Sequence, residues 1–240
     1  MTVKALNEVE IPQVCRSCSA RHDGMCAALT TAELGLLATH TRHTHHRPGE
    51  ALTIESDEIT SYANVTDGVV KLSRVLRDGR QQLVGLQFAP DLMGRLFGTE
   101  SPITAEAASE VALCRVPKLV LEMLVEGSDE LKRRLLDQSL QDLDDAREWM
   151  VTLGRKTAAE RVASLFLLVA SRTGDGGGKV AGPVSFELPL GRGDMADFLG
   201  LTIETVSRQI SKLRNEGLVS IENHRHVTVP DLAALRRRAG

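Results

Sequence analysis

The hydrophobic pattern of the chain is strand-like from about residue 51 to residue 116 and helix-like beyond Pro117. Short β-rich runs occupy residues 61–65, 69–76 and 82–88, and the pairs Asp67-Gly68 and Asp78-Gly79 lie between them. Asp-Gly pairs favour tight hairpin turns, because glycine accepts the positive φ that these turns need. Several short strands joined by hairpins predict an antiparallel barrel or jelly roll over residues 51–116.

The pattern after Pro117 predicts a long helix at about residues 129–153 with two apolar strips. One strip has the spacing of a coiled-coil seam, with steps of 4, 3 and 7, and consists of Leu136, Leu140, Leu143 and Met150. The other strip is expected to pack on the chain's own barrel and consists of Leu131, Leu135, Trp149 and Leu153. Two strips favour a helix with two partners, one of them a second subunit, over a helix packed only within its own chain.

The last sixty residues predict a strand at 184–188, a short helix at 194–199, a second helix from Thr202 to Gly217, and a hairpin wing at 218–221 and 227–229. Gly200 permits the sharp turn that lets two helices meet at a steep angle. Thr202 suits an N-cap, because its hydroxyl can accept from a free backbone N–H. This order of elements predicts a winged helix-turn-helix rather than an ordinary helical hairpin with a solvated face.

The second of these helices separates an apolar face from a polar one. Val206, Ile210 and Leu213 share the face that we expect to be buried. The opposite face carries the candidate base-contacting residues, which together with the helix start are Thr202, Glu204, Ser207, Arg208 and Ser211. Arginine can grip guanine O6 and N7 with two hydrogen bonds, and glutamate can accept from cytosine N4. The pattern therefore predicts a recognition helix for double-stranded DNA.

Three of the four cysteines lie within twelve residues, as C-x2-C-x7-C. They are Cys15, Cys18 and Cys26, and the fourth, Cys114, lies in the strand-like run VALCRV. In a reducing compartment this spacing indicates metal binding rather than disulfides, and Gly24 would let the chain fold back. Four thiolates suit tetrahedral zinc or an iron–sulfur cluster, and the spacing alone also leaves a metal-free chain open.

Composition and charge narrow the class of protein. With 42% hydrophobic and 25% charged residues the chain can bury a core, and no apolar run is long enough for a membrane span. The N-terminus lacks the blocks of a secretion signal, so we expect a cytoplasmic protein. The net charge is −3, yet residues 156–240 carry 12 Lys and Arg against 9 Asp and Glu. This bias is compatible with a DNA-contacting C-terminal part.

The chain carries no motif that indicates an enzyme. A phosphate loop, a nucleophile elbow and a zinc-protease motif are all missing from the sequence, and the acidic run QDLDDARE is expected to be a solvated helix face. His40, His43, His45 and His46 are expected in a solvated polar loop before Pro48-Gly49 rather than at a metal.

The segment LGRGDMADFLGLTIETVSRQISKLRNEGLV, residues 190–219, resembles the DNA-binding region of the CRP/FNR transcription regulators. The resemblance extends over nearly the whole chain, through RPGE at 47–50, DGVVKL at 67–72 and KTAAERVASLF at 156–166. The block ETVSR is similar to the base-reading block of the FNR branch. The resemblance implies that Glu204, Ser207 and Arg208 contact a TTGAT-like half-site, and that a homodimer reads two half-sites in a palindrome.

The same resemblance favours an iron–sulfur cluster over zinc. Members of the FNR branch hold an oxygen-labile 4Fe–4S cluster with an N-terminal cysteine trio and one barrel cysteine, which implies Cys15, Cys18, Cys26 and Cys114 here. The x7 spacing is similar to that of FnrL-type variants. The implied function is an oxygen-responsive transcription activator, with a zinc- or thiol-based redox regulator or an iron–sulfur electron carrier as alternatives.

The resemblance also implies partners and a domain order. Asp91 and Arg95 correspond to a surface that relatives use to contact RNA polymerase. Cyclic nucleotide is not expected, because the stretch Gly94-Arg95-Leu96 lacks the glutamate of nucleotide-binding members and no Arg-Ser pair follows it. The expected α+β chain has a cysteine-rich segment at 1–28, a cyclic-nucleotide-binding-like barrel at 29–127, a dimerisation helix at 128–155 and a winged helix-turn-helix at 156–240.

Overall fold

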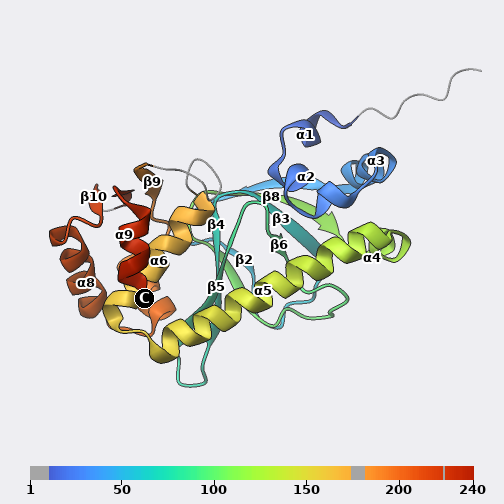
Figure 1. Ribbon diagram of the computed structural model, residues 1–240. Coiled ribbons are helices and arrows are strands. Elements are labelled where there is room, and N and C mark those ends of the chain that lie inside the picture. Colours follow the sequence, from blue (N-terminus) through green and yellow to red (C-terminus); the bar gives the residue numbers. More distant parts are fainter. Residues whose placement is uncertain (1–10, 174–181, 224) are drawn as a thin grey trace, which may run out of the picture. The chain divides into compact units, whose positions relative to one another are not determined.

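The computed structural model describes residues 11–173, 182–223 and 225–240, and its elements confirm the α+β fold (Figure 1). Short helical turns precede the barrel strands, in the order α1 (Gln13–Arg16), α2 (Ser19–His22), η1 (Met25–Ala28) and α3 (Thr31–His40). The strands of the barrel are β1 (Arg42–His46), β2 (Ala51–Thr53), β3 (Ser61–Asp67), β4 (Val69–Val75), β5 (Gln81–Phe88), β6 (Leu92–Met93), β7 (Thr104–Ala107) and β8 (Val111–Pro117).

The C-terminal half is mainly helical and ends in a small sheet. Its elements are α4 (Lys118–Gly127), α5 (Asp129–Arg155), α6 (Ala158–Thr173), β9 (Val184–Glu187), α7 (Arg192–Leu199), α8 (Ile203–Asn215), β10 (Ser220–Glu222), β11 (His226–Val229) and α9 (Leu232–Ala239). The predicted long helix, recognition helix and wing strands are thereby confirmed to within a few residues. No helix in the described ranges has both the length and the apolar character needed to cross a membrane.

The chain divides into two compact units, residues 1–70 with 87–141 and residues 71–86 with 142–240. The first unit contains the sheet β1-β8-β3-β6, and a second barrel sheet has the order β2-β7-β4-β5. The C-terminal unit contains the three-stranded sheet β10-β11-β9 and the β4–β5 turn region. In that unit Lys71 Nζ lies 2.7 Å from Asp194 Oδ1 of α7. The four-domain order inferred from the sequence stays a prediction.

The core of the first unit forms where β3 and β8 meet α4 and the start of α5. Tyr62 of β3 is fully buried there, and its hydroxyl donates to Glu122 Oε1 of α4 at 2.6 Å. The Tyr62 hydroxyl also accepts from the backbone N–H of Phe97 at 3.0 Å. Gly94, with φ of +109°, passes so close that a Cβ there would lie 2.8 Å from the Tyr62 ring. The tyrosine therefore fixes the loop that follows β6.

The second apolar strip of α5 has different neighbours at its two ends. Leu131 and Leu135 belong to the buried core of the first unit, as expected. Trp149 packs on Phe198 of α7, with ring centroids 4.5 Å apart, and its predicted contact with the barrel stays a prediction.

The winged helix-turn-helix has the local features that the sequence predicts. Gly200 ends α7 in the left-handed conformation, with φ of +60°, and its N–H donates to Ala196 O. Thr202 caps α8, because its hydroxyl accepts from the N–H of Thr205 at 3.3 Å. Met195 and Leu199 are fully buried, which fixes α7 against its unit.

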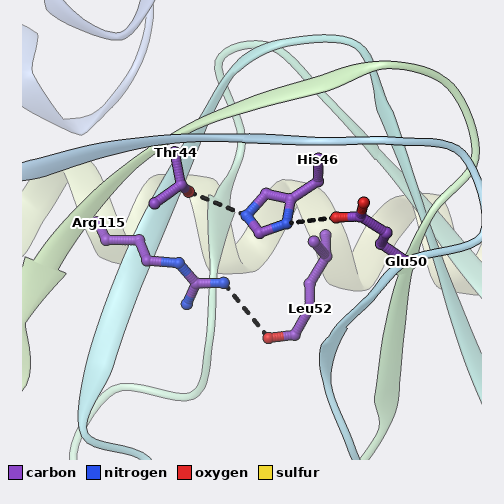
Figure 2. Close-up of polar contacts among 5 residues, drawn as sticks. All are labelled: Thr44, His46, Glu50, Leu52 and Arg115. Atoms are coloured by element: carbon purple, nitrogen blue, oxygen red, sulfur yellow. Dashed lines mark hydrogen bonds and ion pairs between the residues drawn. The ribbon is translucent and has the colours of Figure 1, made fainter.

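Three of the histidines lie on a strand, so their expected placement in a loop is wrong. His43, His45 and His46 are part of β1, which pairs with β8, and His40 ends α3. The strand is polar on both faces, so no alternation revealed it. His46 lies between Thr44 Oγ1 at 3.0 Å and Glu50 Oε2 at 3.2 Å, as Figure 2 shows. In the same view Arg115 donates to Leu52 O at 3.4 Å, and burial lowers the pKa of its guanidinium.

Candidate cysteine centre and nucleic-acid interface

Four cysteine thiols from separate elements line one small pocket in the first unit. Cys15 lies in α1, Cys18 at the N-terminus of α2, Cys26 in η1 and Cys114 in β8. The rest of the lining mixes apolar residues with a few polar ones and comprises Val14, Ala20, Arg21, Leu34, Leu37, Ala38, Thr41, His43 and Asn64. The structure thus brings the N-terminal trio to the strand that carries the fourth cysteine.

Gly24 allows the lead segment to turn back toward the barrel between its second and third cysteines. A Cβ at this position would lie 2.9 Å from the carbonyl oxygen of Ala20 and 3.0 Å from that of Pro90. Any larger residue would therefore have to displace backbone. Arg134 of α5 donates to the carbonyl of Asp23, and Met25 is fully buried in the core, so the turn is held on both sides of the glycine.

Burial and the neighbouring sulfurs affect the ionisation of the Cys26 and Cys114 thiols. Burial raises the pKa of Cys26 to about 12, with smaller contributions from negative charge on Cys114, Cys18 and Cys15. Burial likewise raises the pKa of Cys114 to about 11, with a contribution from Cys18 and an opposing hydrogen bond from Thr41. The free thiols of Cys26 and Cys114 are therefore protonated at neutral pH. A cation in the pocket would be needed to hold them as thiolates.

The donor set fits an iron–sulfur cluster or zinc chemically, since thiolates are the ligands that both prefer. In the described parts of the chain, however, no three His, Cys, Asp or Glu side chains are spaced to hold a metal ion. The pocket volume of about 20 Å³ is room for about one water. A cluster would therefore require the four sulfurs to spread.

Asn64 is a polar residue of this pocket that the sequence reasoning missed. Its side chain is fully buried on β3, directly opposite Cys114 in the β3–β8 pairing. Its Nδ2 lies 3.9 Å from Cys26 Sγ, and its Oδ1 has no hydrogen-bond partner among the described residues. The available signal was an amide within an otherwise buried strand run, SYANV, where asparagine is unfavourable.

The recognition helix α8 exposes every residue that the sequence assigns to base contact. Thr202, Glu204, Ser207, Arg208 and Ser211 are exposed. Val206, Ile210 and Leu213 are buried beneath them, so the two predicted faces are present. The face combines an acidic acceptor with a guanidinium donor at the end of the helix that a reader inserts into the major groove.

Local hydrogen bonds set the state of this face. Arg208 Nη2 donates to Thr205 Oγ1 at 3.3 Å, and Ser211 Oγ donates to the carbonyl of Ser207 at 3.0 Å. The backbone N–H of Glu204 and the Thr202 hydroxyl lower the pKa of the Glu204 carboxyl. The carboxylate is therefore ionised near neutral pH and can accept from a base.

The predicted seam of α5 is an exposed apolar row. Leu136, Leu140, Leu143 and Met150 are 59%, 51%, 45% and 72% exposed, and Val151 beside them is 53% exposed. Arg147 interrupts this row between Leu143 and Met150. A row of exposed large apolar side chains on one helix is characteristic of a protein–protein contact.

Comparison with known proteins gives consistent matches to both halves of the chain. Residues 43–128 match a family model described as a cyclic nucleotide-binding domain, and residues 160–238 match one described as a Crp-like helix-turn-helix domain. A probable transcriptional activator of Rhizobium leguminosarum bv. viciae is 47% identical over 96% of this chain and 95% of its own. The transcriptional activator protein FnrL of Cereibacter sphaeroides is 37% identical over 96% of this chain and 95% of its own.

A solved structure agrees with these matches. FixK2 from Bradyrhizobium japonicum superposes with a TM-score of 0.75 at 30% identity, covering 83% of this chain and 98% of that one.

Proposed function

Because the chain belongs to the CRP/FNR family of transcription regulators, we propose that it is an oxygen-responsive transcription activator that reads a TTGAT-like palindrome as a homodimer. We propose further that a 4Fe–4S cluster is its sensor. The proposal of a sensor is supported by one observation: four cysteines line one pocket, at the point where the lead segment contacts the barrel. The observation that carries the DNA half is the exposed polar face of α8.

Cys15, Cys18, Cys26 and Cys114 would hold the cluster, which when bound supplies an iron centre that oxygen destroys. Cys114 is the member of the set on a barrel strand, so ligation through it ties the lead segment to β8. Leu34 and Leu37 are buried beside the pocket and exclude water from that side.

In this proposal α8 reads the DNA, and the seam of α5 pairs the two subunits. Two copies of α8 in one dimer engage two half-sites together, so the dimer gains avidity that one subunit lacks. For contact with RNA polymerase, Arg95 is the better of the two predicted residues. Its side chain is exposed, whereas the Asp91 carboxylate accepts from the N–H of Phe88 within its own turn.

The sensor half predicts a coloured protein. Prepared without oxygen, the full chain should be brown, contain about four iron and four sulfide per subunit, and absorb broadly near ~400 nm because thiolate and sulfide ligands transfer charge to iron. Air should bleach it. The measurement is iron and sulfide analysis together with the visible spectrum. One tightly held zinc would favour a zinc regulator of the same fold. Reversible one-electron cycling without specific DNA binding would favour an electron carrier.

The DNA half predicts that Arg208→Ala removes sequence preference. A bidentate arginine–guanine contact contributes about 1–3 kcal/mol of discrimination, so the preference for a TTGAT-containing duplex over a scrambled one should fall about 5- to 150-fold. Competition titrations at fixed salt measure it. Lys212→Ala is the matched control: it removes a cation from the same helix that lies 3.9 Å from Glu216. This variant should keep the preference, and equal preference in both variants would reject Arg208 as a base reader.

A further inference from the structure

The cysteine pocket contains one polar side chain that is fully buried and is not a cysteine, that of Asn64. Burying an amide whose oxygen has no partner is destabilising, and native proteins seldom keep such a group without a reason. The neighbouring strand positions are apolar and equally buried: Ala63 and Val65 flank it. A leucine or valine would satisfy the packing of β3 at this position without that penalty.

The position of the Asn64 amide indicates which groups it can bind. Asn64 pairs with Cys114 across β3 and β8, while its Nδ2 points to Cys26 at 3.9 Å. The amide thus lies between Cys26, which is buried, and Cys114, which is its partner on the neighbouring strand. An amide NH₂ has two N–H donors, so it can serve two sulfurs at once.

We propose that Asn64 is a positioning residue of the metal centre. Its side-chain amide would donate one N–H group to the Cys26 thiolate and the other to the sulfur of Cys114. The inference rests on the proposed function only in that the cysteines hold a metal centre. A thiolate buried in an apolar pocket needs compensation for its charge, and N–H donors to sulfur provide it. A neutral thiol is a weak acceptor. With a thiolate in its place the same donor gains a strong partner.

Asn64→Leu tests this role, since leucine has nearly the same shape but no donor. Reconstituted without oxygen, the variant should take up iron through its four cysteines but lose it to an anaerobic iron chelator several-fold faster than the unmodified protein. Its sulfur-to-iron charge-transfer bands should move to longer wavelength, because a sulfur without a hydrogen bond gives up its electron density more easily. The metal-free variant should melt at the same temperature or higher, because an unsatisfied buried amide is gone.

Two further variants separate donation from packing. Asn64→Asp keeps the shape, removes the N–H donors and adds negative charge. It should therefore retain less iron than either the unmodified protein or Asn64→Leu. Ser73→Ala removes another buried polar side chain, on β4 and away from the pocket lining, and should change neither retention nor spectrum. If Asn64→Leu loses iron faster with its bands unmoved and a lower melting temperature, the residue serves packing alone and the proposal is wrong.

The proposal and the function beneath it fail in different ways. An unmodified protein that binds neither iron nor zinc overturns the metal centre itself. An unmodified protein that holds its cluster, with an Asn64→Leu variant identical in retention and spectrum, overturns only the role of Asn64.

Discussion

Leu140→Asp is expected to turn the protein into a monomer and to lower its affinity for the palindromic operator by about 100-fold or more. Leu140 lies in the middle of the exposed row on α5, which runs from Leu136 to Met150. If that row pairs with its copy, the substitution buries two unpaired carboxylates at the centre of an apolar contact, which costs several kcal/mol. Sedimentation gives the oligomeric state, and titration of palindromic and single-half-site duplexes gives the affinity. The single-half-site affinity should hardly change.

Leu119→Asp is the matched control for this experiment. Leu119 is also an exposed leucine, 80% accessible, but it lies on α4 and outside the row. The same charge placed there should leave the dimer and the operator affinity intact. A Leu140→Asp protein that stays dimeric would show that the row on α5 is not the subunit contact, and the pairing of two recognition helices would need another surface.

The secondary structure could be predicted wherever local chemistry determines it. The winged helix-turn-helix is the clearest case, because Gly200 has the positive φ that its turn demands and Thr202 caps the next helix through its own hydroxyl. Both effects act within four residues. The hairpin turns of the barrel at Gly68 and Gly79 follow the same rule, since both glycines have positive φ.

The errors arose where distant neighbours decide the structure. β1 is a strand because it hydrogen-bonds to β8, about 70 residues later in the chain, and its polar sequence RHTHH gave no periodic signal. Trp149 shares a helical strip with Leu135, yet the partner of each depends on how far along α5 it lies. Hydrophobic spacing identifies a face of a helix but not what covers it.

The residues of the candidate site also differ in whether the sequence alone could predict them. The cysteine trio could be predicted because the three residues are close in sequence, and Cys114 could be added only because no fifth cysteine exists. Asn64 could not be predicted as a neighbour of Cys26 and Cys114, because that depends on the register of β3 against β8 across fifty residues. The polar shell of a site comes from tertiary structure, even when its ligands are evident in the sequence.

Cys114→Ser should abolish stable iron loading while the fold is kept. Serine nearly matches cysteine in volume, but its hydroxyl does not ionise at neutral pH and gives iron a poor ligand. The loss should be nearly complete, because Cys114 is the one cysteine on the barrel and its removal leaves the trio on the lead segment alone. Anaerobic iron analysis measures loading. Operator titration of the same sample should match that of air-treated unmodified protein.

Ala112→Ser is the control that separates the loss of the sulfur from the presence of a new hydroxyl on β8. It places the same hydroxyl two residues away on β8, on a partly buried residue outside the cysteine pocket, without removing a sulfur. It should load iron like the unmodified protein. If Cys114→Ser also loads fully, the cysteines do not act as a set of four. If both variants bind the operator equally with and without oxygen, a regulator that senses oxidants through free thiols becomes the better explanation. Only a metal-linked switch requires strand β8 and the lead segment to share one set of ligands.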